Sequence, residues 1–127
     1  MRSWLHVQDF CNAIDLISQN APDFETYNVS GEERTNLQVL GKVAEHLDRD
    51  IDQHIEYVHD RPSPDLRYAV ASTKLQNTLG WQPQFAVDRH LGDVIGWYAD
   101  NPGWWQAIKN RKEFLDHYEK QSKGQWY

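Results

Sequence analysis

The chain has 127 residues and a net charge of −6 at pH 7, so its length allows one domain with a real core but not two. This acidic balance is unlike the basic footprint of proteins that bind nucleic acid or anionic membranes. The single cysteine, Cys11, excludes an internal disulfide and fits a reducing compartment. Because no apolar run approaches membrane length and no signal peptide opens the sequence, we expect a cytoplasmic protein.

The first part of the chain predicts a helix, a strand and a second helix. Four apolar residues recur at helical spacing over residues 9–18, namely Phe10, Ala13, Ile14 and Ile17. Aromatic and β-branched residues over 24–29 predict a strand. Thr35, followed three residues later by Gln38, is typical of a capping box. A helix is therefore expected to begin there and to end near residue 48.

The rest of the chain predicts two short strands and three helices. The strands are expected over 54–58 and 67–70, and the helices over 72–79, from about 87 to just before Pro102, and over 104–121. Gly92 and Gly96 lie one turn apart, a spacing that indicates close packing of the middle helix against a neighbour.

A loop rich in proline carries Arg61 and leads to Arg67. Pro62 and Pro64 fix the backbone φ angle and favour extended geometry in the residues before them, so the loop is stiff. A guanidinium on a stiff loop can bind phosphate with little loss of freedom. The alternative is a structural turn whose arginines pair with nearby carboxylates.

Short motifs follow one another along residues 2 to about 105: Arg-Ser-Trp-Leu-His-Val-Gln-Asp (2–9), Tyr-Asn-Val-Ser-Gly (27–31), Glu-Arg-Thr-Asn-Leu (33–37), Asp-Arg-Pro (60–62), Asp65 with Arg-Tyr-Ala (67–69), Thr-Lys-Leu (73–75) and Leu-Gly-Trp-Gln-Pro (79–83). This ordered set resembles the C-terminal part of dTDP-glucose 4,6-dehydratases, nucleotide-sugar enzymes of the extended short-chain dehydrogenase/reductase group. The resemblance implies a helix-rich α/β fold, namely the C-terminal substrate-binding portion of such an enzyme without its N-terminal Rossmann half.

The resemblance also implies a domain organisation for residues 1–127, which would form a single C-terminal nucleotide-sugar-binding fragment. Residues 1–31 would pack on the missing NAD domain, 32–121 would form part of the substrate domain, and 122–127 would be a frayed tail.

Catalytic residues are not expected in this chain. It has no Gly-x-Gly-x-x-Gly turn for a dinucleotide, and no tyrosine is followed four residues later by lysine, the acid/base pair of the resembled group. The spacing of histidine and cysteine fits no zinc site. We therefore expect no catalytic residue, metal or cofactor here, and an isolated chain that is inactive. The resembled enzymes are lyases whose bound NAD oxidises the sugar at C4 and, after water is eliminated across C5–C6, returns the hydride to the sugar.

Binding residues, in contrast, can be carried over from the resemblance. The candidate substrate-binding residues are Arg2, Asn36, Asp60, Arg61, Pro62 and Tyr68. Arg2 and Arg61 would bracket the diphosphate, and Asn36 at a helix start would add donors that favour an anion. Tyr68 would add a hydroxyl or a ring face. The implied partner is a nucleotide sugar of the dTDP-hexose class.

The sequence departs from the family pattern inside this loop. Ser63 and Pro64 stand where the resembled enzymes have Gly-His, and Leu66 replaces a second arginine. Two alternatives therefore stay open. The chain is part of another nucleotide-sugar enzyme, such as an epimerase or a decarboxylase, or it is an interaction module that binds no ligand.

A strand over 24–29 would lack its neighbours if the first half of the enzyme were absent. Unpaired strand edges invite pairing with another chain, so we expect a homo-oligomer formed through Phe24 to Val29. The rival expectation is that this strand pairs within the chain with the strand over 54–58.

Overall fold

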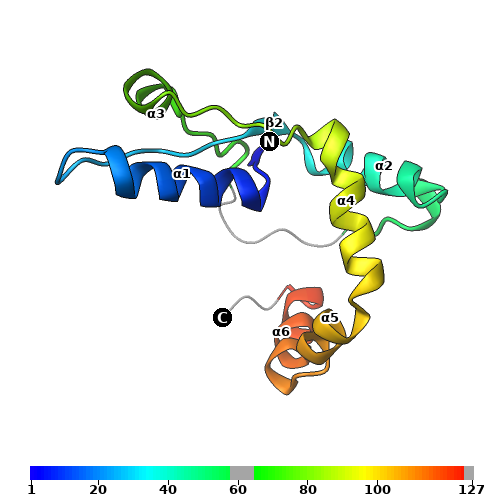
Figure 1. The fold of residues 1–127 in the computed structure, drawn as a ribbon. Helices are drawn as coiled ribbons and strands as arrows, with labels where there is room; N and C mark the ends of the chain where they lie inside the picture. Colours follow the sequence, from blue (N-terminus) through cyan, green and yellow to red (C-terminus); the bar gives the residue numbers. More distant parts are fainter. Residues whose placement is uncertain (58–64, 125–127) are drawn as a thin grey trace.

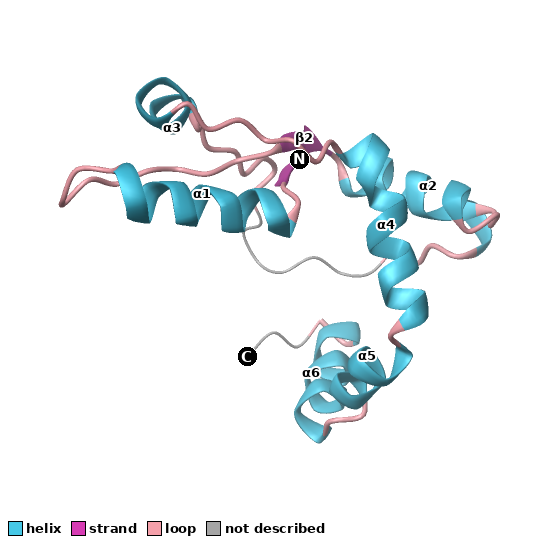
Figure 2. Ribbon diagram, in the orientation of Figure 1, coloured by secondary structure: helices cyan, strands magenta, loops and turns pink. Residues whose placement is uncertain are grey.

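The computed structural model describes residues 1–57 and 65–124, and Figure 1 shows their arrangement. The described elements are β1 (Arg2–Trp4), α1 (Val7–Asn20), β2 (Glu32–Arg34), α2 (Asn36–His46), a 3-10 turn η1 (Ile51–Gln53), α3 (Thr73–Leu79), α4 (Val87–Asp100), α5 (Pro102–Lys109) and α6 (Lys112–Ser122). Helices dominate and strands are few (Figure 2). The expectation of a helix-rich fold is therefore confirmed.

Four of the predicted helices form close to their expected bounds. They are α1, α2, α3 and α4. The capping box of α2 is present, because the Thr35 hydroxyl accepts a 3.1 Å hydrogen bond from the Gln38 amide. The Gln38 side chain in turn accepts one of 2.8 Å from the Thr35 amide. Local sequence signals decide these helices because both the caps and the apolar spacing act within a few residues.

Two of the predicted strands do not form. Residues 25–30 are extended but unpaired, and Phe24 has a φ of 64° and a fully exposed side chain. Tyr27 and Val29 pack on the core beside α1 instead of entering a sheet. Residues 54–57 also form no strand, and residue 58 lies outside the described part. A strand needs a partner to satisfy its amides and carbonyls, and neither segment meets one among the described residues.

The sheet that does form is a short antiparallel pair that the sequence analysis did not foresee. In β1 and β2, Arg2 lies opposite Arg34, Ser3 opposite Glu33 and Trp4 opposite Glu32. The third predicted strand, over 67–70, is reduced to a parallel bridge between Tyr68 and Arg2. Both strands are three residues long and mostly polar, so neither carries the apolar alternation that marks a strand.

The main core lies between α1 and α3. Ala13, Leu75 and Trp81 are buried there, with partly buried apolar residues around them. The carboxylate of Asp9 is also buried, and it accepts hydrogen bonds from the backbone amides of Gln84 and Phe85. The segment that leads into α4 is therefore fixed to the first turn of α1.

A second unit is formed by α2 and α4, which contact each other directly. A side-chain methyl at Gly92 would lie 2.8 Å from the ring of His46, whereas one at Gly96 would meet nothing within 4 Å. Close packing of α4 against a neighbour is therefore confirmed at Gly92 and is wrong at Gly96. Asp88, in the first turn of α4, forms ion pairs with Lys42 of α2 and with Arg34 of β2.

The single helix predicted over 104–121 is wrong, because the chain forms two helices there. Helix α5 begins with Pro102 at its first position, where proline costs no hydrogen bond. Arg111 then adopts an extended backbone and α6 begins at Lys112. Figure 1 shows α5 and α6 at the far end of α4, away from α1. No helix among the described residues combines the length and the apolar character that crossing a membrane requires.

Candidate functional site

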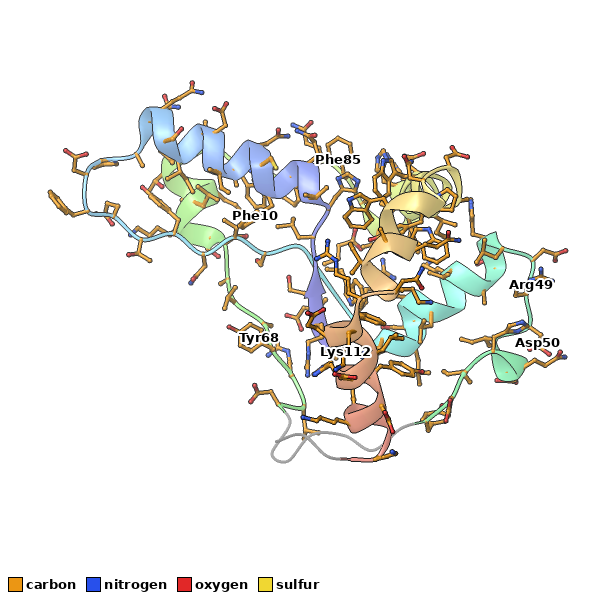
Figure 3. All side chains as sticks on the ribbon, turned by 90° about the horizontal axis from the view of Figure 1, so that it is seen from below. Phe10, Arg49, Asp50, Tyr68, Phe85 and Lys112 are labelled. Atoms are coloured by element: carbon orange, nitrogen blue, oxygen red, sulfur yellow. The ribbon has the colours of Figure 1, made fainter. Side chains whose placement is uncertain are left out.

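Arg2 and Tyr68, which are 66 positions apart in the numbering of the chain, lie side by side on neighbouring backbones. The amide of Tyr68 donates a 3.1 Å hydrogen bond to the carbonyl of Met1, which fixes this segment along the outer edge of β1. The Tyr68 side chain is 62% exposed, so its ring and hydroxyl are open to a ligand (Figure 3). The fold thus brings together two of the predicted binding residues.

A second guanidinium lies on the same face of the sheet. Arg2 and Arg34 are directly opposite in the antiparallel register, and opposite residues share a face. Arg34 is occupied, because it bonds to Glu32 at 2.7 Å and to Asp88 at 3.1 Å. Arg2 donates to the carbonyl of Met1 at 2.8 Å and pairs with no carboxylate within residues 1–57 and 65–124. Arg2 is therefore the better candidate to bind an added anion.

Arg67 pairs with a carboxylate. Its Nε and Nη2 donate to the two oxygens of Glu33, at 2.7 and 2.6 Å. This two-pronged bond lowers the pKa of Glu33 and raises the pKa of Arg67. For Arg67 the structure thus confirms the alternative interpretation, a structural pair with a nearby carboxylate.

Asn36 is the first residue of α2 and is exposed. It lies two residues after Arg34 in the chain, at the helix end where the macrodipole favours negative charge. The other predicted binding residues, Asp60, Arg61 and Pro62, lie outside the described residues. Their place relative to Arg2 stays a prediction.

Two shallow pockets of about 320 Å³ each lie elsewhere on the molecule. One is between α2 and α4 and includes Lys42, His46 and Asp88. The other is formed by α1 and the segment around Trp81. Neither is lined by Arg2, Asn36 or Tyr68. In the part of the chain that the structure describes, no group of three histidine, cysteine or carboxylate side chains could hold a metal ion.

Sequence reasoning missed the charged residues that hold this face in place, namely Glu32, Glu33, Arg34 and Asp88. The segment Glu-Glu-Arg (32–34) has no apolar alternation, the pattern that would have indicated a strand. Apart from the pair of Arg34 with Glu32, the hydrogen bonds that fix this face join residues 34 to 55 positions apart, so spacing gave no indication of them.

The chain matches the model of the family described as GDP-mannose 4,6 dehydratase over residues 1–94. It belongs to this family. Among curated relatives, dTDP-glucose 4,6-dehydratase of Escherichia coli is 36% identical over 120 residues, a match that covers 85% of this chain and 33% of the relative. The enzyme of that name from Mycobacterium tuberculosis strain H37Rv is 37% identical over 115 residues, covering 89% of this chain and 34% of the relative.

Solved structures give the same result. The chain is similar to dTDP-glucose 4,6-dehydratase from Bacillus anthracis in complex with NAD, with a TM-score of 0.77, 34% identity and coverage of 84% of this chain and 34% of that one. It is also similar to the enzyme from Streptomyces venezuelae with NAD and TYD bound, with a TM-score of 0.79, 32% identity and coverage of 84% and 33%. The chain thus spans about a third of the length of these relatives. The resemblance to dTDP-glucose 4,6-dehydratases is confirmed.

Proposed function

We propose that this chain is the substrate-binding part of a dTDP-glucose 4,6-dehydratase-like enzyme and that it binds the diphosphate of a nucleotide sugar. The observation that carries the proposal is the position of Arg2, whose guanidinium pairs with no carboxylate in the described part of the chain and lies beside Tyr68. The relative from Streptomyces venezuelae has been solved with the ligands TYD and DAU, which supports a nucleotide sugar of the dTDP class as the partner.

In this proposal Arg2 donates hydrogen bonds to the diphosphate oxygens, since a guanidinium matches phosphate geometry. Tyr68 contributes its hydroxyl or its ring face, and Asn36 contributes an amide at the start of α2. Asp60, Arg61 and Pro62 would complete the site, an assignment that rests on the resemblance alone. In this proposal, groups outside the described residues bind the rest of the ligand.

We assign no catalytic step and no cofactor to the residues of this chain. The similar structures hold NAD, and this chain spans about a third of their length. Oxidation of the sugar and elimination of water would therefore be carried out by residues that this sequence does not contain. The isolated chain would bind a nucleotide sugar without converting it.

The test is a thermal denaturation series with dTDP, UDP and GDP added separately. A ligand that binds only the folded chain at about 100 times its Kd stabilises it by about 2.7 kcal/mol and raises the melting temperature. We expect a rise with dTDP that Arg2→Ala abolishes. Arg49→Ala is the matched control, because Arg49 is an exposed arginine on the connector after α2 (Figure 3).

The three nucleotides also separate the remaining alternatives. A rise with GDP alone would agree with the description of the matched family as GDP-mannose 4,6 dehydratase. A rise with UDP alone would favour another nucleotide-sugar enzyme such as an epimerase or decarboxylase. No rise with any of them would contradict the proposal and favour an interaction module.

Self-association through residues 24–29 stays a prediction, although residues 24–29 do not form the strand on which it was based. The segment is not an orphan strand, and it does not pair with residues 54–57. Phe24 is fully exposed, and a contact between chains would bury its ring. Light scattering across the micromolar range tests this expectation, and a monomer at every concentration would contradict it.

A further inference from the structure

We propose that Glu33 is a positioning residue for the diphosphate site, which it organises by holding Arg67 and thereby Tyr68. The inference rests on the proposed function and assigns a role to a side chain that would not touch the ligand. It follows from the way in which three short backbone segments are tied together around Arg2.

The segment that carries Tyr68 is attached to the sheet at two kinds of contact. Its backbone makes the single bridge to Arg2, donates a hydrogen bond from the Tyr68 amide to the carbonyl of Met1, and accepts one of 2.7 Å at the Leu66 carbonyl from the Met1 ammonium. Its side chains contribute the two bonds from Arg67 to Glu33, at 2.7 and 2.6 Å. Because Glu33 lies on β2 and the bridge is on β1, the ion pair spans the width of the sheet.

The two faces of this small sheet carry different side chains. Successive side chains along an extended segment point to opposite faces. Glu33 shares a face with Ser3, its cross-strand partner, whereas Arg2 and Arg34 share the other. Arg67 reaches Glu33, so the next residue, Tyr68, is directed to the face of Arg2. The ion pair thus clamps one face of the sheet, and the ligand would bind on the other.

Because Glu33 is negatively charged, removing its charge changes the Kd in opposite directions depending on whether Glu33 positions Tyr68 or acts only through its charge. Glu33 is an anion close to a site for an anion, so removing its charge should strengthen the binding of a diphosphate if only charge mattered. If Glu33 instead holds Tyr68 in place, its removal lowers the fraction of binding-competent chains and weakens binding. The two explanations predict opposite changes in Kd.

The experiment compares Glu33→Gln with Glu25→Gln in the full 127-residue chain, with dTDP as the titrant in isothermal calorimetry. Glu25 is a matched control, because it also forms an exposed ion pair, with Lys74, but on the segment beside α3. The titrations are made well below the melting temperature of both variants, so that loss of folded chain does not contribute. We expect Glu33→Gln to raise the Kd about three- to tenfold and Glu25→Gln to leave it unchanged.

An unchanged or lower Kd in Glu33→Gln, with dTDP still bound by the wild-type chain, would overturn the positioning role and leave the proposed function standing. If the wild-type chain binds no dTDP, the proposed function fails, and hydrogen exchange then decides the role of Glu33. The amide of Tyr68 should exchange at least about threefold faster in Glu33→Gln than in Glu25→Gln. Equal exchange rates would overturn the clamp itself.

Discussion

The carboxylate of Asp9 accepts a 2.8 Å hydrogen bond from the backbone amide of Gln84, which lies 75 residues further along the chain. The same carboxylate accepts a 3.0 Å bond from the amide of Phe85, and the backbone carbonyl of Asp9 accepts one of 3.3 Å from the indole of Trp81. This single residue therefore joins the first turn of α1 to the segment that enters α4. It is almost completely buried, with 1% of its surface exposed.

Removing the Asp9 carboxylate should destabilise the chain. In Asp9→Ala two backbone amides lose their acceptor, at a cost of about 1–3 kcal/mol for each one that water cannot reach. Both bonds are only partly buried, so we expect a total loss of about 2 kcal/mol, measured by urea denaturation. Asp15→Ala on the exposed side of α1 is the control and should change stability by less than about 0.5 kcal/mol. Equal losses in the two variants would contradict this role.

Gly80→Ala should also destabilise the chain, through the backbone. Gly80 ends α3 with a φ of 72°, a left-handed conformation in which a side chain is strained by about 1–2 kcal/mol. Gly41 lies inside α2, where an added methyl would meet nothing within 4 Å. Gly41→Ala should therefore stabilise the chain by up to about 1 kcal/mol, because alanine is the better helix former. Opposite signs in chemical denaturation are the expected result.

The contact between α2 and α4 can be tested with the two glycines of α4. Gly96→Ala should stabilise the chain by up to about 1 kcal/mol, since a methyl there meets open space. Gly92→Ala gains the same helix propensity, but its methyl would lie 2.8 Å from the His46 ring, which must then move. We expect Gly92→Ala to be the less stable of the two. A Gly92→Ala variant at least as stable as Gly96→Ala would show that His46 does not define this contact.

Acid should weaken the attachment of α4 to β2. The hydrogen bond with Lys42 lowers the pKa of Asp88 from its ordinary value of 3.8. The hydrogen bond with Arg34, and after it the one from the amide of Val87, lower the pKa of Glu32 from its ordinary value of 4.5. A carboxylate whose pKa is depressed in the folded state contributes stability above its unfolded pKa and loses it as the pH falls through the folded value. The urea midpoint should therefore decrease below about pH 4.5.

Asp88→Asn removes one member of this network. Its urea midpoint should be lower than that of the wild type at neutral pH and should fall less steeply on acidification. Asp116→Asn on α6 is the control, because Asp116 is exposed and forms no ion pair within the described residues. A pH profile of Asp88→Asn parallel to that of the wild type would remove Asp88 from the network.

The sequence predicted the helices better than it predicted the strands. Thr35 and Gln38 mark the start of α2 within four residues, and the apolar spacing of α1 is equally local. The break between α5 and α6 was missed, because neither Asn110 nor Arg111 is a helix breaker by type. The strand expected at Phe24 failed since its residues found contacts with α1 and α3 instead of a partner strand.

The sequence also predicted only part of the candidate site. The motifs around Arg2, Asn36 and Tyr68 named residues that lie on or beside the small sheet, and the family matches confirmed the resemblance that they carry. The pairing of Arg67 with Glu33 was left open by the sequence, because it depends on a contact across 34 residues.

The sequence by itself determined the family of this chain and the positions of most helices. These features depend on short-range patterns, which act through caps, spacing and turn residues. The tertiary structure alone decided that Arg34 is occupied by Glu32 and Asp88 while Arg2 pairs with no carboxylate in the described part of the chain. The physical reason is that the partner of a charged group is set by which distant segments the packed helices bring within hydrogen-bonding distance.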